Sequence, residues 1–179
     1  MMHETIAWVI IVCGLMGSLI TLLMRVGAAS AFSRALSSKA QNSTSALLYT
    51  WLLGLVVFID DYLNALAVGS SMRKVTDKFK VSREMLAYVV DSTAAPICVL
   101  VPVSTWAVFY AGLFMDAGYA ESGQGMALYV SAIPYMVYPI AAMLLVPLVA
   151  AGIVPALGMM KSAQQRAAEG TAPLPIDEG

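Results

Sequence analysis

The stretch LLYTWLLGLVVFIDDYLNALAVG, residues 47–69, decides the fold. An apolar run from Leu47 to Ile59 leads straight into Asp60 and Asp61, and a second apolar run follows at residues 65–69. A carboxylate at the centre of a bilayer-spanning helix costs at least ~2.5–3.5 kcal/mol, and such residues usually serve a function. The polar residues Asp60, Asp61, Tyr62 and Asn64 therefore predict a turn, or the start of a return arm, inside an otherwise apolar segment.

The composition indicates a membrane protein. The chain has 179 residues, of which 60% are hydrophobic and 12% charged, and its mean hydropathy is +0.79. Soluble domains carry roughly 25% charged residues. The net charge of -1 argues against a nucleic-acid partner, which would call for a basic patch. The two cysteines, Cys13 and Cys98, lie in apolar stretches without a CxxC spacing and indicate neither a disulfide framework nor a zinc site.

Four apolar segments lie between the charged stretches, and no basic residue interrupts them. They are Thr5 to Met24, Ala46 to Gly69, Ala87 to Met115 and Ala127 to Leu157. Each is at least as long as the roughly 20 residues that a helix needs to cross a bilayer. We therefore expect a membrane domain over residues 1–160, with the first segment retained as an anchor. A cytoplasmic tail follows over residues 161–179, a short exposed helix that gives way to a disordered end.

The charges of the loops predict that one apolar segment does not cross the membrane. Residues 25–45 carry three basic residues and no acid, and residues 70–86 carry five basic and two acidic residues, so both loops are expected inside the cell. A single crossing by residues 46–69 would place them on opposite sides. A re-entrant hairpin resolves the conflict, and such a hairpin is tolerated only where protein or a wet cavity surrounds it. The prediction is then three transmembrane helices plus the hairpin, with the N-terminus outside.

Three carboxylates lie inside apolar stretches, Asp60, Asp61 and Asp91. One of the first two could merely cap a helix or pair with nearby bases, but this does not explain all three. Asp91 heads the string Asp91-Ser92-Thr93-Ala94-Ala95-Pro96. A proline removes a backbone donor, so we expect the helix to break at Pro96. We expect Pro102 to extend the broken part of the helix.

The candidate ion and proton site consists of oxygen-bearing side chains from both stretches. A broken helix exposes carbonyls that, with hydroxyls and carboxylates, suit a small alkali cation. For Ser104 and Thr105 we favour ordinary interhelical hydrogen bonding. The expected binding residues are Asp60, Asp61, Asn64, Asp91, Ser92 and Thr93.

A series of motifs resembles one transporter family. They are Phe58 to Gly69, Met72-Arg73, Thr76-Asp77-Lys78, Ser82-Arg83-Glu84, Leu86 to Pro96 and Ile133-Pro134-Tyr135. In this order they look like the NhaC-type Na+/H+ antiporter family, from about Thr5 to Glu169. The resemblance implies the ion-transporter superfamily fold, in which two inverted repeats each contribute a re-entrant hairpin and a broken helix. Residues 46–69 would be the hairpin and residues 87–115 the broken helix.

The resemblance also implies function, location and partners. It implies a multi-pass protein of the bacterial cytoplasmic membrane that exchanges Na+ for H+, with no cofactor and no enzymatic activity. Family members are much longer, so this chain would hold part of one repeat. The candidate partners are the lipid bilayer, the missing repeat and a second copy in a homodimer.

The expected mechanism is competition between Na+ and a proton at a buried aspartate. Burial and a nearby second acid both favour the protonated form of a carboxyl group. We expect Asp61 and Asp91 to be the exchanging pair and to hold Na+, with the other candidates as further ligands.

Other functions remain open at this stage. Coupled exchange of an organic acid such as malate or lactate is one, although no Lys or Arg lies in a membrane segment to meet its carboxylate. A non-transporting subunit or fragment is another. An intramembrane aspartic protease is disfavoured because the chain has Asp61-Tyr62 rather than Tyr-Asp and no Gly-x-Gly-Asp string.

Overall fold

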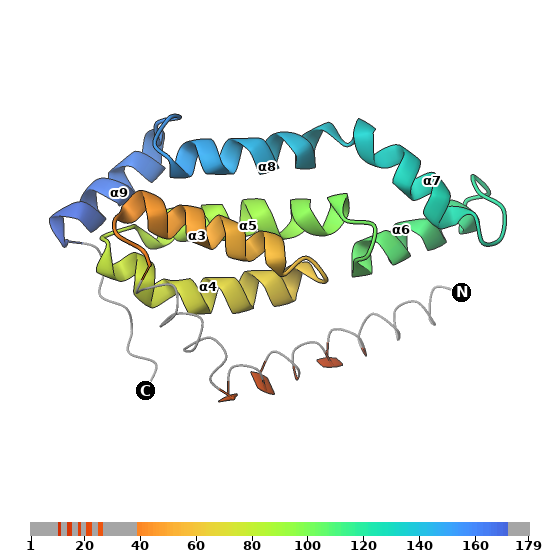
Figure 1. Cartoon of the computed structure of the whole chain (residues 1–179), viewed down its shortest axis with the longest axis horizontal. Coiled ribbons are helices and arrows are strands. Elements are labelled where there is room, and N and C mark those ends of the chain that lie inside the picture. The colour runs from red at the N-terminus through yellow and green to blue at the C-terminus, as the bar shows by residue number, and fades with distance from the viewer. Residues whose placement is uncertain are drawn as a thin grey trace.

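The computed structural model describes residues 11, 14–15, 18, 21–22, 25–26 and 39–171. Most of the predicted segment 5–24, and the end of the tail at residues 172–179, lie outside these residues. Within residues 39–171 every regular element is helical, which confirms the all-helical part of the predicted fold (Figure 1). The helices are α3 (Ser43–Val56), α4 (Asp61–Lys78), α5 (Arg83–Leu100), α6 (Thr105–Asp116), α7 (Gly125–Ala132), the 3-10 turn η1 (Ile133–Tyr135), α8 (Val137–Ala150) and α9 (Gly158–Glu169).

Helices α3 and α4 form the predicted hairpin, with its turn at residues 57–60. Both helices begin at capping side chains: the Asn42 side chain accepts from the Ser45 backbone N–H, and that of Asp60 accepts from the Leu63 backbone N–H. The return arm is longer than predicted. It continues as helix through the charged residues to Lys78, so the expected loop 70–86 is reduced to a turn at residues 79–82.

Two hydrophobic clusters hold the hairpin against the rest of the fold. The first joins α3 and α4 to α5 through Ala46, Val68, Met72 and Val90. The second joins α3 and the start of α5 to α8 through Leu47, Val89, Val146 and Ala150. Helix α5 therefore lies at the centre of the fold, in contact with α3, α4, α6, α8 and α9.

No single described helix is long and apolar enough to cross a membrane. Two bent pairs do meet the length and composition of a crossing: α5 with α6, bent by 50°, and residues 125–135 with α8, bent by 53°. These pairs correspond to the predicted segments 87–115 and 127–157. Figure 1 shows the two pairs running lengthwise, while the α3–α4 hairpin reaches only as far as the bend between α5 and α6.

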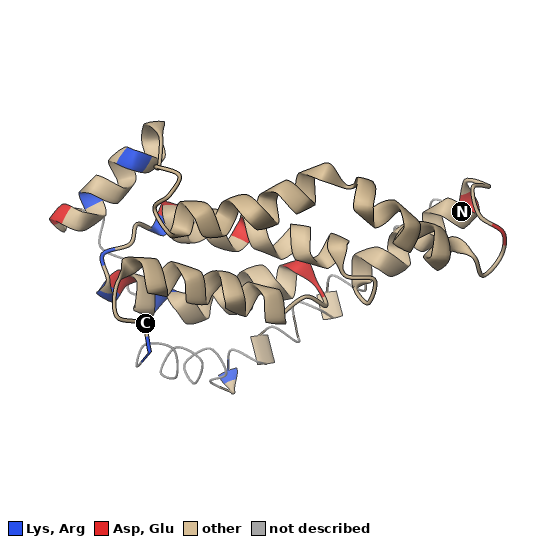
Figure 2. Ribbon diagram, turned by 45° about the horizontal axis from the view of Figure 1, so that its top comes forward, with Lys and Arg blue, Asp and Glu red and all other residues tan. Residues whose placement is uncertain are grey.

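Most of the charged residues lie near the ends of the fold, and the acidic residues at the hairpin turn and in the middle of α5 are exceptions. Figure 2 shows the basic residues of α4, α5 and α9 at the end where α4 turns into α5, and acidic residues at the far tip between α6 and α7. At the basic end, α9 packs on α5, and Ala163 and Ala167 of α9 are buried. The predicted exposed helix of the tail is thus a packed element, since one face of α9 is covered.

Candidate ion site at two helix breaks

Asp60 lies where the hairpin turn meets the bend between α5 and α6. The residue is 6% exposed, and one carboxylate oxygen accepts a hydrogen bond from the Leu63 backbone N–H at 2.9 Å. The other oxygen accepts from the Thr105 hydroxyl at 3.2 Å. The Thr105 backbone N–H donates to the Ile59 carbonyl at 3.0 Å. The two interruptions of the helices are therefore joined directly, with a buried carboxylate in the contact.

Asn64, one turn further along α4, closes the hairpin. Its side-chain N–H groups donate to the Gly54 and Val57 carbonyls, each at 2.7 Å. Its amide oxygen is buried and has no hydrogen-bond partner among the described residues. Leaving a buried acceptor unpaired costs roughly 1–3 kcal/mol. A bound cation would satisfy this oxygen, so Asn64 Oδ1 is a candidate ligand.

Thr93 brings α5 to the same place. Its side chain is fully buried against Gly54, and its hydroxyl donates to the Val89 carbonyl at 2.6 Å. A Cβ added at Gly54 would lie 2.8 Å from Thr93 Cγ2 and 3.6 Å from Asn64 Oδ1. Asn64 and Thr93 thus both approach Gly54, and the lack of a side chain at position 54 makes this approach possible.

Asp91 lies apart from this cluster. It is exposed on α5, whereas Thr93 is buried. Successive residues of an α-helix are about 100° apart, so Asp91 and Thr93 project about 160° from each other. Ser92, between them, is half-buried.

Asp61 is half-buried in the first turn of α4. Asp60 and Asp61 both lie within electrostatic range of the buried Cys98 thiol. Cys98 is seven residues beyond Asp91, about 10 Å along the axis of α5. The structure therefore does not bring together the expected pair Asp61 and Asp91.

The prediction that the helix breaks at Pro96 is wrong. Helix α5 is continuous through Pro96, and the bend lies at residues 101–104, next to Pro102. The string from Asp91 to Pro96 is therefore helical, and Pro96 deprives only the Ser92 carbonyl of this string of its usual helical donor. After Pro102 a new helix can begin, because the Ser104 side chain caps α6 by accepting a hydrogen bond from the Ala107 backbone N–H at 3.1 Å.

Three residues have contacts in the structure that the sequence analysis did not predict. Thr105 is assigned ordinary hydrogen bonding, yet its partner is the candidate carboxylate Asp60. A Ser-Thr pair two residues after Pro102 is a signal for a helix restart. Gly54 carries no such local signal, since it contacts Thr93 of another helix. The same holds for Tyr129 of α7, whose hydroxyl donates to the Val99 carbonyl of α5.

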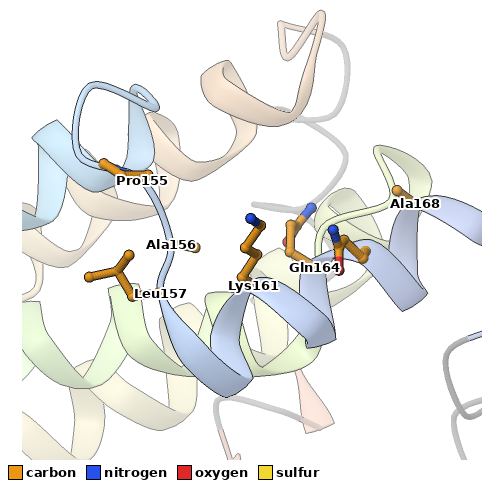
Figure 3. A pocket seen from close by; sticks show the side chains of 7 residues that line it. Pro155, Ala156, Leu157, Lys161, Gln164 and Ala168 are labelled. Carbon is orange, nitrogen blue, oxygen red and sulfur yellow. The ribbon is translucent and has the colours of Figure 1, made fainter.

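The pocket shown in Figure 3 is a separate feature. It has a volume of about 510 Å³ and lies between α9 and the segment that precedes it. Its lining consists of Pro155, Ala156, Leu157, Lys161, Gln164, Gln165 and Ala168. A lining with a lysine and no carboxylate does not suit a cation. Among the described residues, no group of three or more His, Cys, Asp or Glu side chains could hold a metal ion.

Comparison with known proteins adds a relative without an assigned activity. The chain is 48% identical over 95 residues to a protein of Haemophilus influenzae that is described as uncharacterized. The match covers 53% of this chain and 18% of the relative, so the matched stretch spans less than a fifth of that protein's length. No family model matches the chain. No solved structure matches it.

Proposed function

We propose that this chain is the hairpin and broken-helix part of a secondary transporter that exchanges Na+ for H+ across a membrane. The observation that carries the proposal is Asp60, an acidic residue with 6% exposure at the contact between two helix interruptions. Burial of a carboxylate is costly unless the group is paired as well as hydrogen-bonded, and we infer that a cation or a proton joins the two hydrogen bonds of Asp60. Alternation between these two occupants is the chemistry of exchange.

The surface of the fold supports a membrane location. Large apolar side chains are exposed along the bent pairs, among them Val108, Leu113, Val130, Leu144 and Leu145. Apolar exposure on this scale marks a surface that lipid or other protein covers. Basic residues at one end agree with the preference for Lys and Arg on the cytoplasmic side.

The length of the hairpin supports re-entrance. Helix α3 has 14 residues and so extends about 21 Å, short of a hydrocarbon core of about 30 Å. The hairpin turn meets the bend between α5 and α6. Polar groups of the turn and of Thr105, the first residue of α6, therefore pair with each other. Non-helical backbone at membrane depth requires such cover.

Asp60 and Asn64 are the proposed centre of the cation site. The Asp60 carboxylate supplies the charge, and Asn64 Oδ1 and the Thr105 hydroxyl supply neutral oxygens. Asp61 is the nearest second acid in sequence and tunes the exchange through its charge. We propose Asp60 and Asn64 as the centre in place of the expected pair Asp61 and Asp91, because Asp60 is buried and Asn64 Oδ1 has no hydrogen-bond partner among the described residues.

A proton-flux assay in vesicles tests the proposal. The chain is reconstituted alone and beside the remaining repeat of a longer relative, and dequenching of a pH-sensitive dye is followed after Na+ is added. Asp60→Asn should abolish Na+-dependent proton movement, Asp61→Asn should reduce it, and Asp91→Asn should leave most of it. Asp77→Asn, an exposed acid of α4 that pairs with Arg83, is the control and should be silent.

Two outcomes would overturn the proposal. Activity that survives Asp60→Asn would remove the carboxylate from the mechanism. No Na+-dependent proton movement in either preparation would favour organic-acid exchange, which uptake of labelled malate or lactate would detect, or a structural subunit.

A further inference from the structure

At the bend between α5 and α6 the last carbonyls of α5 lose their usual helical partners, and those of Cys98 and Val99 are among them. In a continuous helix the Cys98 carbonyl would accept from residue 102 and the Val99 carbonyl from residue 103. Residue 102 is a proline without an N–H, and residue 103 lies outside both helices. Buried carbonyls of this kind need another donor.

Two side-chain hydroxyls satisfy these carbonyls. The Ser104 hydroxyl, close in sequence, donates to the Cys98 carbonyl. The Tyr129 hydroxyl donates to the Val99 carbonyl, and it comes from α7, 30 residues further along the chain. The bend is therefore closed in part by a residue of the other bent pair.

Tyr129 is held firmly in this position. Its side chain is fully buried, and its ring stacks on Tyr110 of α6 with centroids 5.9 Å apart. Tyr110 in turn stacks on Trp106 at 5.8 Å. One turn before Tyr129, Gly125 approaches α6 so closely that an added Cβ would lie 2.2 Å from the Ala111 carbonyl oxygen. Tyr129 thus contacts α6 with its ring and the end of α5 with its hydroxyl.

We propose that Tyr129 is a positioning residue whose hydroxyl holds the bend between α5 and α6 closed over the candidate ion site. The inference rests on the proposed function for its link to transport. Thr105, which bonds Asp60, is the first residue of α6, so the angle of α6 fixes this contact. Loss of the Tyr129 hydroxyl frees the Val99 carbonyl and lets the bend open more often.

Cys98 provides a reporter that does not depend on transport. Its thiol is fully buried in the last turn of α5, and its own carbonyl belongs to the bend. With Cys13→Ser as background, the full chain in lipid vesicles is labelled with N-ethylmaleimide, with and without Na+. Tyr129→Phe should speed the labelling of Cys98 about tenfold, which corresponds to about 1.4 kcal/mol. Ser104→Ala, which removes the second donor, should act in the same direction.

Two controls separate a local effect from a general loss of stability. Tyr110→Phe removes a hydroxyl from the same ring stack without touching the bend carbonyls, and should leave Cys98 labelling unchanged. A reporter thiol made by Ala46→Cys in a Cys98→Ser chain lies fully buried near the start of α3, and Tyr129→Phe should not change its labelling.

Three results decide the matter. Equal labelling of Cys98 in the Tyr129→Phe and Tyr110→Phe chains would overturn the proposal. Faster labelling at both reporter positions in Tyr129→Phe would also overturn it, since the effect would then be global. If Na+ changes neither labelling nor proton flux, the ion site is refuted, while a tenfold difference confined to Cys98 would still support Tyr129 as the residue that closes the bend.

Discussion

Gly54 occupies the point of closest approach between α3 and α5, and two opposing effects meet there. An alanine at a helical glycine position gains about 1 kcal/mol of helix propensity. Its Cβ, however, would lie 2.8 Å from Thr93 Cγ2, which is well inside contact distance. Overpacking of this kind typically costs 1–3 kcal/mol. Because the steric cost exceeds the gain in propensity, we expect Gly54→Ala to lower the free energy of unfolding by about 1 kcal/mol, measured by denaturant titration in detergent.

Thr93 offers a matched control for this expectation. Thr93→Ser removes the obstructing methyl group and keeps the hydroxyl that bonds the Val89 carbonyl. In that background the gain in helix propensity acts alone, so Gly54→Ala should become neutral or stabilising. Thr93→Val keeps a methyl group and should not rescue Gly54→Ala. Equal effects of Gly54→Ala in the Ser and Val backgrounds would show that the contact between α3 and α5 is not the cause.

At the scale of elements, sequence reasoning located the hairpin but misplaced the bend, and the reason is local. Proline marks a position where a helix can stop, whereas a break also needs a residue that can start the next helix. After Pro96 come Ile97, Cys98, Val99 and Leu100, and none of them is a good N-cap. After Pro102 comes Ser104, which caps α6. The hairpin was predictable because its turn carries Asp60, a capping residue between two apolar runs.

The Gln164 side chain makes two of the hydrogen bonds that attach helix α9 to the turn between α4 and α5, and Lys80 Nζ makes a third, to the Ala168 carbonyl at 3.3 Å. The Gln164 amide accepts from the Ser82 backbone N–H at 3.0 Å and donates to the Lys80 carbonyl at 3.1 Å. Two such bonds contribute roughly 1–3 kcal/mol. Gln164→Ala should therefore release α9 and speed tryptic cleavage after Lys161 and Arg166 about tenfold. Gln165→Ala, on an exposed neighbour, is the control, and equal cleavage of both variants would contradict the role of Gln164.

At the scale of the whole molecule, the sequence could predict which segments are apolar but not which of them meet. Tyr129 and Val99 lie in different apolar segments, and no local pattern predicts that the hydroxyl of one bonds the carbonyl of the other. Composition and loop charge do predict one global property, the side of the membrane on which each turn lies. In the fold, the two ends of the hairpin lie at the basic end.

Thiol accessibility tests this arrangement directly. Single cysteines at Ser43 and Lys78, the two ends of the hairpin, and at Ser162 of α9 should react with a membrane-impermeant maleimide from the cytoplasmic side. A cysteine at Ser122, in the acidic turn between α6 and α7, should react from the opposite side. All four positions are exposed, so burial does not confound the comparison. If Ser43→Cys and Lys78→Cys react from opposite sides, the hairpin crosses the membrane. Re-entrance, and with it the burial of Asp60 at membrane depth, would then be wrong.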